Sequence, residues 1–284
     1  MASTREIKRR ISSVRNTQKI TRAMEMVASV KMRKARQQML SARPYAEKLL
    51  EISGHLRASM SANLSPLLAS RPAKKINLIV VTSDKGLCGG FNAYVCRKAV
   101  DFIREHESVE IQLTVIGKKG NDFFKRRTTP ILDSYADVFI KPKYADAAHA
   151  AGKIMNDFLS GVADESWIVY NELTGAAAQR TVVRKLLPIE PPEMEKKSIP
   201  EYLVEPDEGT VVDLVLRKYQ LFQMWRIFLE SYAAEQASRM TAMHGATKNA
   251  GELITKLSLS YNKARQGSIT KELLEIVSGA DALH

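Results

Sequence analysis

A hydrophobic seam in the C-terminal part constrains the fold of this chain more than any other feature. Its positions alternate by four and three residues, which is the 3.5-residue period of a helix that packs along another helix in a coiled coil. The seam also includes Gln236, Thr247 and small residues, so we expect a softer contact than in a leucine zipper. The pattern predicts one very long helix from about residue 207 to the C-terminus. The seam consists of Val215, Tyr219, Phe222, Arg226, Leu229, Ala233, Gln236, Met240, Met243, Thr247, Ala250, Ile254, Leu257, Tyr261 and Ala264.

The N-terminal segment repeats this spacing. Ser3 or Thr4 can cap a helix with Glu6 close behind, and no Gly or Pro interrupts the pattern before Pro44. We therefore predict a long helix over about residues 3–60. Its seam consists of Ile7, Ile11, Val14, Gln18, Thr21, Glu25, Ala28, Met32, Ala35, Met39 and Ala42, and Ile20, Met24 and Val27 widen it.

Two seamed helices that are separated by a globular insert pair most simply as antiparallel neighbours. If both helices leave the insert at the same level, opposite residue numbers add to roughly 270. In this register the last part of the C-terminal helix, roughly fifteen to twenty residues, has no partner within the chain. That part carries several apolar side chains, which predicts that another protein covers it. These side chains are Ile269, Leu273, Leu274, Ile276, Val277 and Leu283.

Positive charge is concentrated on the N-terminal helix. The formal net charge of the chain is +12, and residues 1–43 contain twelve Lys or Arg but only Glu6 and Glu25 as acids. Such an excess implies an acidic partner, which could be nucleic acid, anionic lipid or an acidic protein surface, and the alternative is a merely solvated helix face. The basic residues are Arg5, Lys8, Arg9, Arg10, Arg15, Lys19, Arg22, Lys31, Arg33, Lys34, Arg36 and Arg43.

The middle of the chain changes from a helical period to short apolar runs. Buried-type strands are predicted at Ile76–Thr82, Glu110–Ile116 and Ser166–Tyr170, because such continuous runs are typical of parallel sheets. Helical segments of suitable length at 93–105, 121–127 and 144–162 separate or follow them, as in a layered α/β domain.

The predicted fold class is therefore α/β. Long N- and C-terminal helices form an antiparallel coiled coil, and a Rossmann-like α/β domain of parallel strands is inserted between them. Prolines mark both connectors, which divide the chain into predicted parts. These parts are the N-terminal helix at 1–60, a linker at 61–75, the α/β domain at 76–190, a linker at 191–206 and the C-terminal helix at 207–284.

No pattern of catalytic, cofactor-binding or metal-binding residues is present in the sequence. The glycine-rich stretch Ser83–Asn92 (SDKGLCGGFN) has neither the GxGxxG nor the GxxxxGK[ST] spacing, so we expect a tight turn in which Asn92 caps the next helix. The five histidines show no metal-ligand spacing. Cys88 and Cys96 are expected to stay reduced thiols. The sequence contains no apolar run long enough for a transmembrane helix and no secretory signal.

Two terminal stretches, together with SDKGLCGGFN, resemble the gamma subunit of the F-type rotary ATP synthase. These stretches are Ile20–Ala35 (ITRAMEMVASVKMRKA) and Arg239–Leu283 (RMTAMHGATKNAGELITKLSLSYNKARQGSITKELLEIVSGADAL), and the similarity extends over the whole chain. The resemblance implies a central-stalk rotor whose paired helices turn inside a ring of alpha and beta subunits. Its α/β domain would form a foot that binds the epsilon subunit and the membrane c-ring.

The resemblance also implies a role and a location. The chain would transmit torque between the c-ring and the catalytic ring during proton-driven ATP synthesis or ATP hydrolysis. It would be non-catalytic alone, without cofactor or direct nucleotide binding, and would lie peripherally at the cytoplasmic face of a bacterial plasma membrane, held there only through the complex. The implied contacts with beta subunits are Met24, Arg239, Arg265, Gln266 and Thr270. The implied contacts with the c-ring or epsilon are Tyr202 and Glu205.

Two other functions are compatible with parts of the sequence. The basic helix is compatible with a coiled coil that binds nucleic acid, although base-stacking aromatic residues are absent from residues 1–43. The α/β domain is compatible with a nucleotide-dependent enzyme, which would require nucleotide binding by the chain itself.

Overall fold

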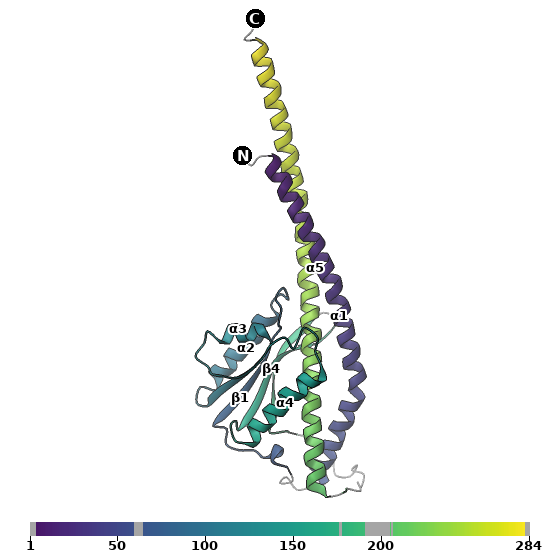
Figure 1. Cartoon of the computed structure of the whole chain (residues 1–284), viewed down its shortest axis with the longest axis vertical. Coiled ribbons are helices and arrows are strands. Elements are labelled where there is room, and N and C mark those ends of the chain that lie inside the picture. The colour runs from purple at the N-terminus through teal and green to yellow at the C-terminus, as the bar shows by residue number, and fades with distance from the viewer. Residues whose placement is uncertain (1–3, 60–64, 176–177, 191–204, 206, 282–284) are drawn as a thin grey trace. The chain divides into compact units, whose positions relative to one another are not determined.

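The computed structural model describes residues 4–59, 65–175, 178–190, 205 and 207–281. Two long helices, α1 (Thr4–Ser59) and α5 (Glu208–Asp281), enclose all the other elements in sequence order (Figure 1). The chain forms two compact units, residues 1–28 with 240–284 and residues 29–239, and each is described by itself. The elements between the long helices are η1 (Pro66–Leu68), β1 (Lys75–Val81), α2 (Phe91–Glu105), β2 (Glu110–Ile116), α3 (Lys118–Phe124), β3 (Ile131–Tyr135), α4 (Tyr144–Leu159), β4 (Glu165–Leu173) and β5 (Gln179–Leu187).

The larger unit, residues 29–239, contains a five-stranded sheet in the order β3-β2-β1-β4-β5. Strands β1, β2, β3 and β4 are parallel, which confirms the prediction for the three apolar runs. The central strand β1 is buried from Ile76 to Val81 because helices cover both faces of the sheet.

The two edge strands were not predicted. β3 has the sequence ILDSY and is only partly buried, and β5 carries four charged or polar side chains among its first six residues. Neither gives the continuous apolar run of a central strand. β5 pairs antiparallel with β4, so the prediction of an all-parallel domain is wrong at this edge.

Helices form a layer on each face of the sheet. Side chains of α2 and Phe124 of α3 pack with β1 and β2 in one core cluster. The other cluster joins α4 to the sheet and to the part of α5 that belongs to this unit. Every residue from Ile227 to Ala237 of α5 is buried. This part of α5 is therefore a core helix of the α/β layers as well as a carrier of the seam.

Some predicted local features differ in the structure. α1 continues through Pro44, since a long helix can lose one backbone hydrogen bond and continue. α2 begins at Phe91 after Gly90, and no side chain caps it, so the prediction that Asn92 caps this helix is wrong. Instead, Asn92 accepts a hydrogen bond from the backbone N–H of Ser83 at 2.9 Å. α3 begins directly after Gly117, three residues before the predicted start.

The smaller unit pairs the beginning of α1 with the C-terminal part of α5 in antiparallel register. The Thr21 and Thr247 hydroxyls lie 2.8 Å apart, Gln18 donates to the Thr247 carbonyl at 3.4 Å, and Glu25 faces His244 at 3.0 Å. These contacts fit the predicted register. The mixture of hydroxyl, amide and imidazole–carboxylate contacts confirms a polar-diluted seam.

Burial confirms both seam patterns. Among the described side chains, no seam position of either long helix is exposed, and Ile7, Ala28 and Ala250 are buried. The prediction that Ile20 and Val27 widen the buried stripe is wrong, because each is more than half exposed. Among the residues that the structure describes, no helix has the length and apolarity needed to cross a membrane.

Candidate interaction surfaces

The C-terminal end of α5 presents a row of exposed apolar side chains, which we term the apolar tip. Their exposed fractions lie between 48% and 68%, and every described side chain from Arg265 to Ser278 is exposed. This exposure confirms, for the described side chains, the prediction that no other element of the chain covers the segment. So many uncovered apolar groups on one helix indicate a surface that another protein buries. The apolar tip consists of Ile269, Leu273, Leu274, Ile276 and Val277. The sixth predicted side chain, Leu283, lies outside the described residues.

The cations of α1 form a basic face. All of the basic side chains named above are exposed except that of Arg43, which lies outside the described side chains. Arg10 pairs with Glu6 at 2.8 Å, and both partners are about half exposed or more, so this pair is weak. The basic face therefore remains accessible to an acidic partner.

The residues that the family resemblance implies as contacts do not form one cluster. Arg265, Gln266 and Thr270 are exposed at or beside the apolar tip, and the Thr270 hydroxyl donates to the Gln266 carbonyl at 3.0 Å. Met24 is half-buried on α1, and Glu205 is exposed. The further candidate Tyr202 lies outside the described residues. Contacts of these residues with other subunits stay predictions.

Arg239 lies in a different environment from the other predicted contact residues. Its guanidinium pairs with the carboxylate of Glu235 at 2.7 Å, and the two side chains are only 10% and 4% exposed. The same guanidinium donates to the carbonyls of Lys85 and Gly86 at 3.2 Å each. Arg239 thus binds the glycine-rich stretch of its own chain, and its contact with a beta subunit stays a prediction.

The glycine-rich stretch is held to the sheet by Asp84. The buried Asp84 carboxylate accepts hydrogen bonds from the backbone N–H groups of Lys118, Asp137 and Phe139 at 2.9, 2.9 and 2.6 Å. Three such bonds fix the loop after β1 against the loops that follow β2 and β3. Leu87 at the turn adopts φ +62° and is exposed. The Asp84 carboxylate therefore holds three loops of the fold together.

A second set of bonds holds the same stretch to α5. The Ser238 hydroxyl donates to the Cys88 carbonyl at 2.6 Å, and it accepts from the Gln179 amide of β5 at 3.3 Å. Sequence reasoning missed this anchor, which we term the loop anchor. It consists of Ser238 and Arg239, which donate to the carbonyls of Cys88, Lys85 and Gly86, and of Glu235, which pairs with Arg239. The sequence did contain a signal for it. Ser238 and Arg239 follow Glu235 by three and four residues, so the three side chains share one face of a helix, and Glu and Arg at this spacing have complementary charges.

Comparison with protein families and curated proteins gives one consistent result. The family described as ATP synthase matches residues 3–283. The ATP synthase gamma chain of Geobacter metallireducens is 44% identical over 286 residues, with 100% of this chain and 99% of that protein covered. The ATP synthase gamma chain of Dehalococcoides mccartyi strain CBDB1 is 45% identical over 285 residues, with both chains covered completely.

Solved structures agree in fold. A chain of the Euglena gracilis mitochondrial ATP synthase (OSCP/F1/c-ring, rotational state 3) aligns with a TM-score of 0.70 and 20% identity, covering 99% of this chain and 94% of its own. A chain of the Tetrahymena thermophila mitochondrial ATP synthase central stalk and c-ring aligns with a TM-score of 0.63 and 24% identity, covering 80% of this chain and 99% of its own. Because the family match spans nearly all residues and relatives more than 40% identical align end to end, the chain belongs to the ATP synthase gamma chain family.

Proposed function

We propose that this chain is the central-stalk rotor subunit of an F-type ATP synthase. Membership of the gamma chain family supports the role. The apolar tip is the structural observation that carries it, because five exposed apolar side chains on one helix end require a protein socket. In the proposed complex, an apolar collar of the alpha and beta ring surrounds this tip as a bearing. The chain carries torque between the c-ring and that ring.

The basic face supports a rotating contact with acidic segments of the beta subunits. Exposed charges interact over a Debye length of about 8 Å at physiological salt, so their attraction averages over neighbouring positions instead of locking one of them. A rotor that must pass equivalent positions in turn requires such a shallow interaction. The chain then changes the populations of open and closed catalytic sites by differential contact.

Individual contacts are proposed for the residues that match the family. Arg265, Gln266 and Thr270 lie exposed beside the apolar tip and are free to meet catch loops of beta. Met24 on the basic helix is proposed to lie beside the acidic lever of beta. The loop anchor gives Arg239 a first role within the chain, and any contact with beta is made by a residue that is already held in place.

The foot and the location follow from the same proposal. The exposed Glu205, together with Tyr202, is proposed to meet the c-ring or the epsilon subunit. The catalytic sites lie on the ring, and this chain is non-catalytic by itself. It is held peripherally at the cytoplasmic face of a bacterial plasma membrane through the complex, in agreement with its bacterial relatives.

Reconstitution of the complex tests this function. Chain lacking residues 265–284 is combined with the alpha, beta and epsilon subunits and a c-ring, in parallel with the full chain. We expect the truncated chain to assemble poorly or to support much less proton-driven ATP synthesis, because the bearing contact is lost. Full assembly with unchanged synthesis would contradict the role of the tip. The nucleic-acid alternative rests on charge alone, and the comparisons give it no support.

A further inference from the structure

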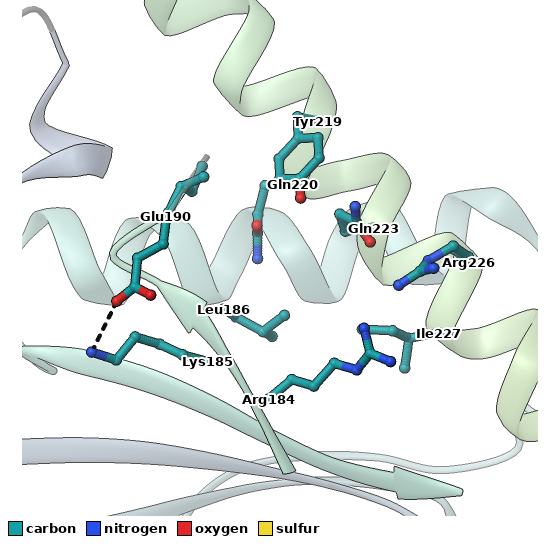
Figure 2. A pocket seen from close by; sticks show the side chains of 10 residues that line it. Arg184, Lys185, Leu186, Glu190, Tyr219, Gln220, Gln223, Arg226 and Ile227 are labelled. Atoms are coloured by element: carbon teal, nitrogen blue, oxygen red, sulfur yellow. Dashed lines mark ion pairs between the residues drawn. The ribbon is translucent and has the colours of Figure 1, made fainter. Parts of the chain in front are cut away.

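A cavity of about 460 Å³ lies in the larger unit, between the end of β5 and α5. Figure 2 shows side chains from both elements converging on it, with Gln220, Gln223 and Arg226 extending from α5 and Arg184 from β5. Apolar side chains complete the lining. The lining residues are Arg184, Lys185, Leu186, Ile189, Glu190, Tyr219, Gln220, Gln223, Arg226 and Ile227.

Two hydrogen-bond donors in this lining have no acceptor among the described residues. Gln220 is only 1% exposed, yet its amide nitrogen Nε2 makes no hydrogen bond, and Figure 2 shows this amide directed from α5 toward β5. The buried Nε of Arg226 is also without a partner. A buried unpaired donor is unfavourable, and two donors facing one cavity indicate an occupant that supplies acceptors.

The charges around the cavity are unequally compensated. Arg184 donates to Glu172 at 2.5 Å, and Lys185 pairs with Glu165 at 3.0 Å and with Glu190 at 3.3 Å. Arg226, by contrast, forms no ion pair within the part of the chain that the structure describes.

The carboxyl group whose charge Arg226 most directly influences is that of Glu230. It is buried and accepts a hydrogen bond from the Tyr170 hydroxyl at 3.3 Å. Burial raises the pKa of Glu230, and the charge of Arg226 opposes this effect. Arg226 thus lines the cavity with an unpaired Nε–H donor.

We propose that this cavity binds a small organic oxyanion, a phosphate ester or a carboxylate, with the oxyanion held by Arg226 and Gln220. Arg presents a fork of N–H donors that fits the oxygens of carboxylate and phosphate, and the Gln220 amide adds a neutral donor. Tyr219 and the apolar side chains of Leu186 and Ile227 contact the organic part of the ligand. A volume of this size is within the usual range of small-ligand pockets.

The site is independent of the proposed rotor function. It uses none of the residues of the apolar tip or the basic face, and it does not depend on assembly of the complex. Since α5 and β5 both line the cavity, a ligand there joins the helix that carries torque to the edge of the sheet.

Calorimetric titration of the full chain tests the proposal. The probes are citrate as a carboxylate, AMP as a phosphate ester, and ribose as an uncharged comparison, all at constant ionic strength. We expect saturable binding of citrate, AMP or both, and none of ribose. Binding of only one anion identifies the oxyanion class. Absence of saturable binding by both anions would overturn the proposal, because the cavity would then hold only water.

Three variants distinguish a built site from general charge attraction. Arg226→Gln removes the charge, and we expect affinity to fall about tenfold or more. Gln220→Leu removes the unpaired donor, so we expect an unchanged or higher melting temperature together with weaker binding. Arg180→Gln removes an exposed charge from β5 at a position outside the cavity, and we expect affinity to change less than about twofold. Equal losses in Arg180→Gln and Arg226→Gln would overturn the proposal.

Discussion

The ion pair of Glu235 and Arg239 is enclosed between α5 and the glycine-rich stretch. Burial raises the pKa of the Glu235 carboxyl to about 7, and the nearby Arg239 guanidinium opposes this shift. Two other charges act on the same carboxyl: Asp84 raises its pKa further, and Lys31 lowers it. Removing the two charges from water costs free energy, which offsets much of their Coulomb attraction. The pair therefore fixes the geometry of the loop anchor but contributes less to the free energy of unfolding than the attraction alone would suggest.

Removing one partner of this pair should be costly. Arg239→Ala leaves Glu235 without its cation and leaves the carbonyls of Lys85 and Gly86 without their donor. We expect the free energy of unfolding of the full chain to fall by about 3–5 kcal/mol. Chemical denaturation measures this change. Arg265→Ala, which alters an exposed residue of the same helix, should change it by no more than about 0.5 kcal/mol. Equal effects would show that the anchor does not contribute to stability.

The pKa of Glu235 also predicts how stability depends on pH. The folded-state pKa of about 7 lies above the reference value of 4.5, so the folded chain binds this proton more tightly than the unfolded chain. The contribution of Glu235 to the free energy of unfolding is therefore complete below pH 4.5. It decreases as the pH rises to about 7 and is constant above that value.

Comparison of Glu235→Gln with the wild type between pH 5 and 8 measures this contribution. The variant should lose a pH-dependent component of about 3 kcal/mol, the equivalent of the pKa shift. Glu252→Gln, which changes an exposed residue of the same helix, should keep the wild-type pH profile. An unchanged profile in Glu235→Gln would show that this carboxyl titrates as it does in the unfolded chain.

At the scale of elements, α5 passes through three environments. From Ile227 to Ala237 it is buried on all sides, from Met240 to Ala264 its seam is buried or half-buried, and from Arg265 to Ser278 its described side chains are exposed. A single helical period therefore serves three different surroundings. The first part holds the helix to the sheet, the second pairs with α1, and the third is left for other chains.

The exposed part should tolerate changes in the isolated chain that the complex does not tolerate. Leu273→Asp with Ile276→Asp places two charges on the apolar tip, where both side chains are more than half exposed. We expect the free energy of unfolding to change by less than about 1 kcal/mol, as for other surface substitutions.

The same double variant should reduce ATP synthesis by the reconstituted complex several-fold, because burying a charge in an apolar socket is unfavourable. Ser268→Asp, at an exposed polar position of the same segment, should have a smaller effect. Normal synthesis by the double variant would contradict the bearing contact.

The sequence predicted the elements whose buried and exposed positions follow one regular pattern along the chain. Both seams, the three apolar strands and the uncovered tip were found because each environment repeats along the chain at a fixed period. β3 and β5 were missed because edge strands alternate between polar and apolar surroundings. We predicted Asn92 as a helix cap because Asn is favoured at that position. Its side chain instead accepts a hydrogen bond from the backbone N–H of Ser83, nine positions earlier.

The site residues depended still more on tertiary context. The loop anchor joins Arg239 to Lys85 and Gly86, which are more than 150 positions earlier in the sequence. The cavity likewise needs β5 beside α5, and β5 itself was not predicted. Pairings over such sequence distances follow from how the layers pack, which no local period contains.

At the scale of the whole molecule, the two long helices carry both the concentrated positive charge and most of the large exposed apolar side chains. The N-terminal part of α1 is strongly basic and also exposes Ile20, Met26 and Val27, whereas α5 exposes the apolar tip at its C-terminal end. Such surfaces suit a subunit that is attracted to acidic partners by charge and is held by burial of its apolar groups. The proposed rotor uses both kinds of contact, and neither requires chemistry within the chain.

Added charge at the proposed lever contact should affect coupling more than folding. Met24 is half-buried, so we expect Met24→Lys to lower the melting temperature of the chain by only a few degrees. In the reconstituted complex, the same change should reduce ATP synthesis relative to ATP hydrolysis. Asn16→Lys adds an equal charge at an exposed position of α1 and should change this ratio less. Unchanged proton-coupled synthesis by Met24→Lys would contradict the proposed contact.

Rotation of this chain inside the ring is the central claim of the account. A complex of alpha, beta and epsilon subunits with this chain is attached to a surface through the ring, and a visible probe is linked to the α/β domain at the exposed Glu107. When ATP is added, the account predicts that the probe turns continuously in one direction and stops when ATP is removed. A stable, ATP-hydrolysing complex in which the probe never turns would contradict the account.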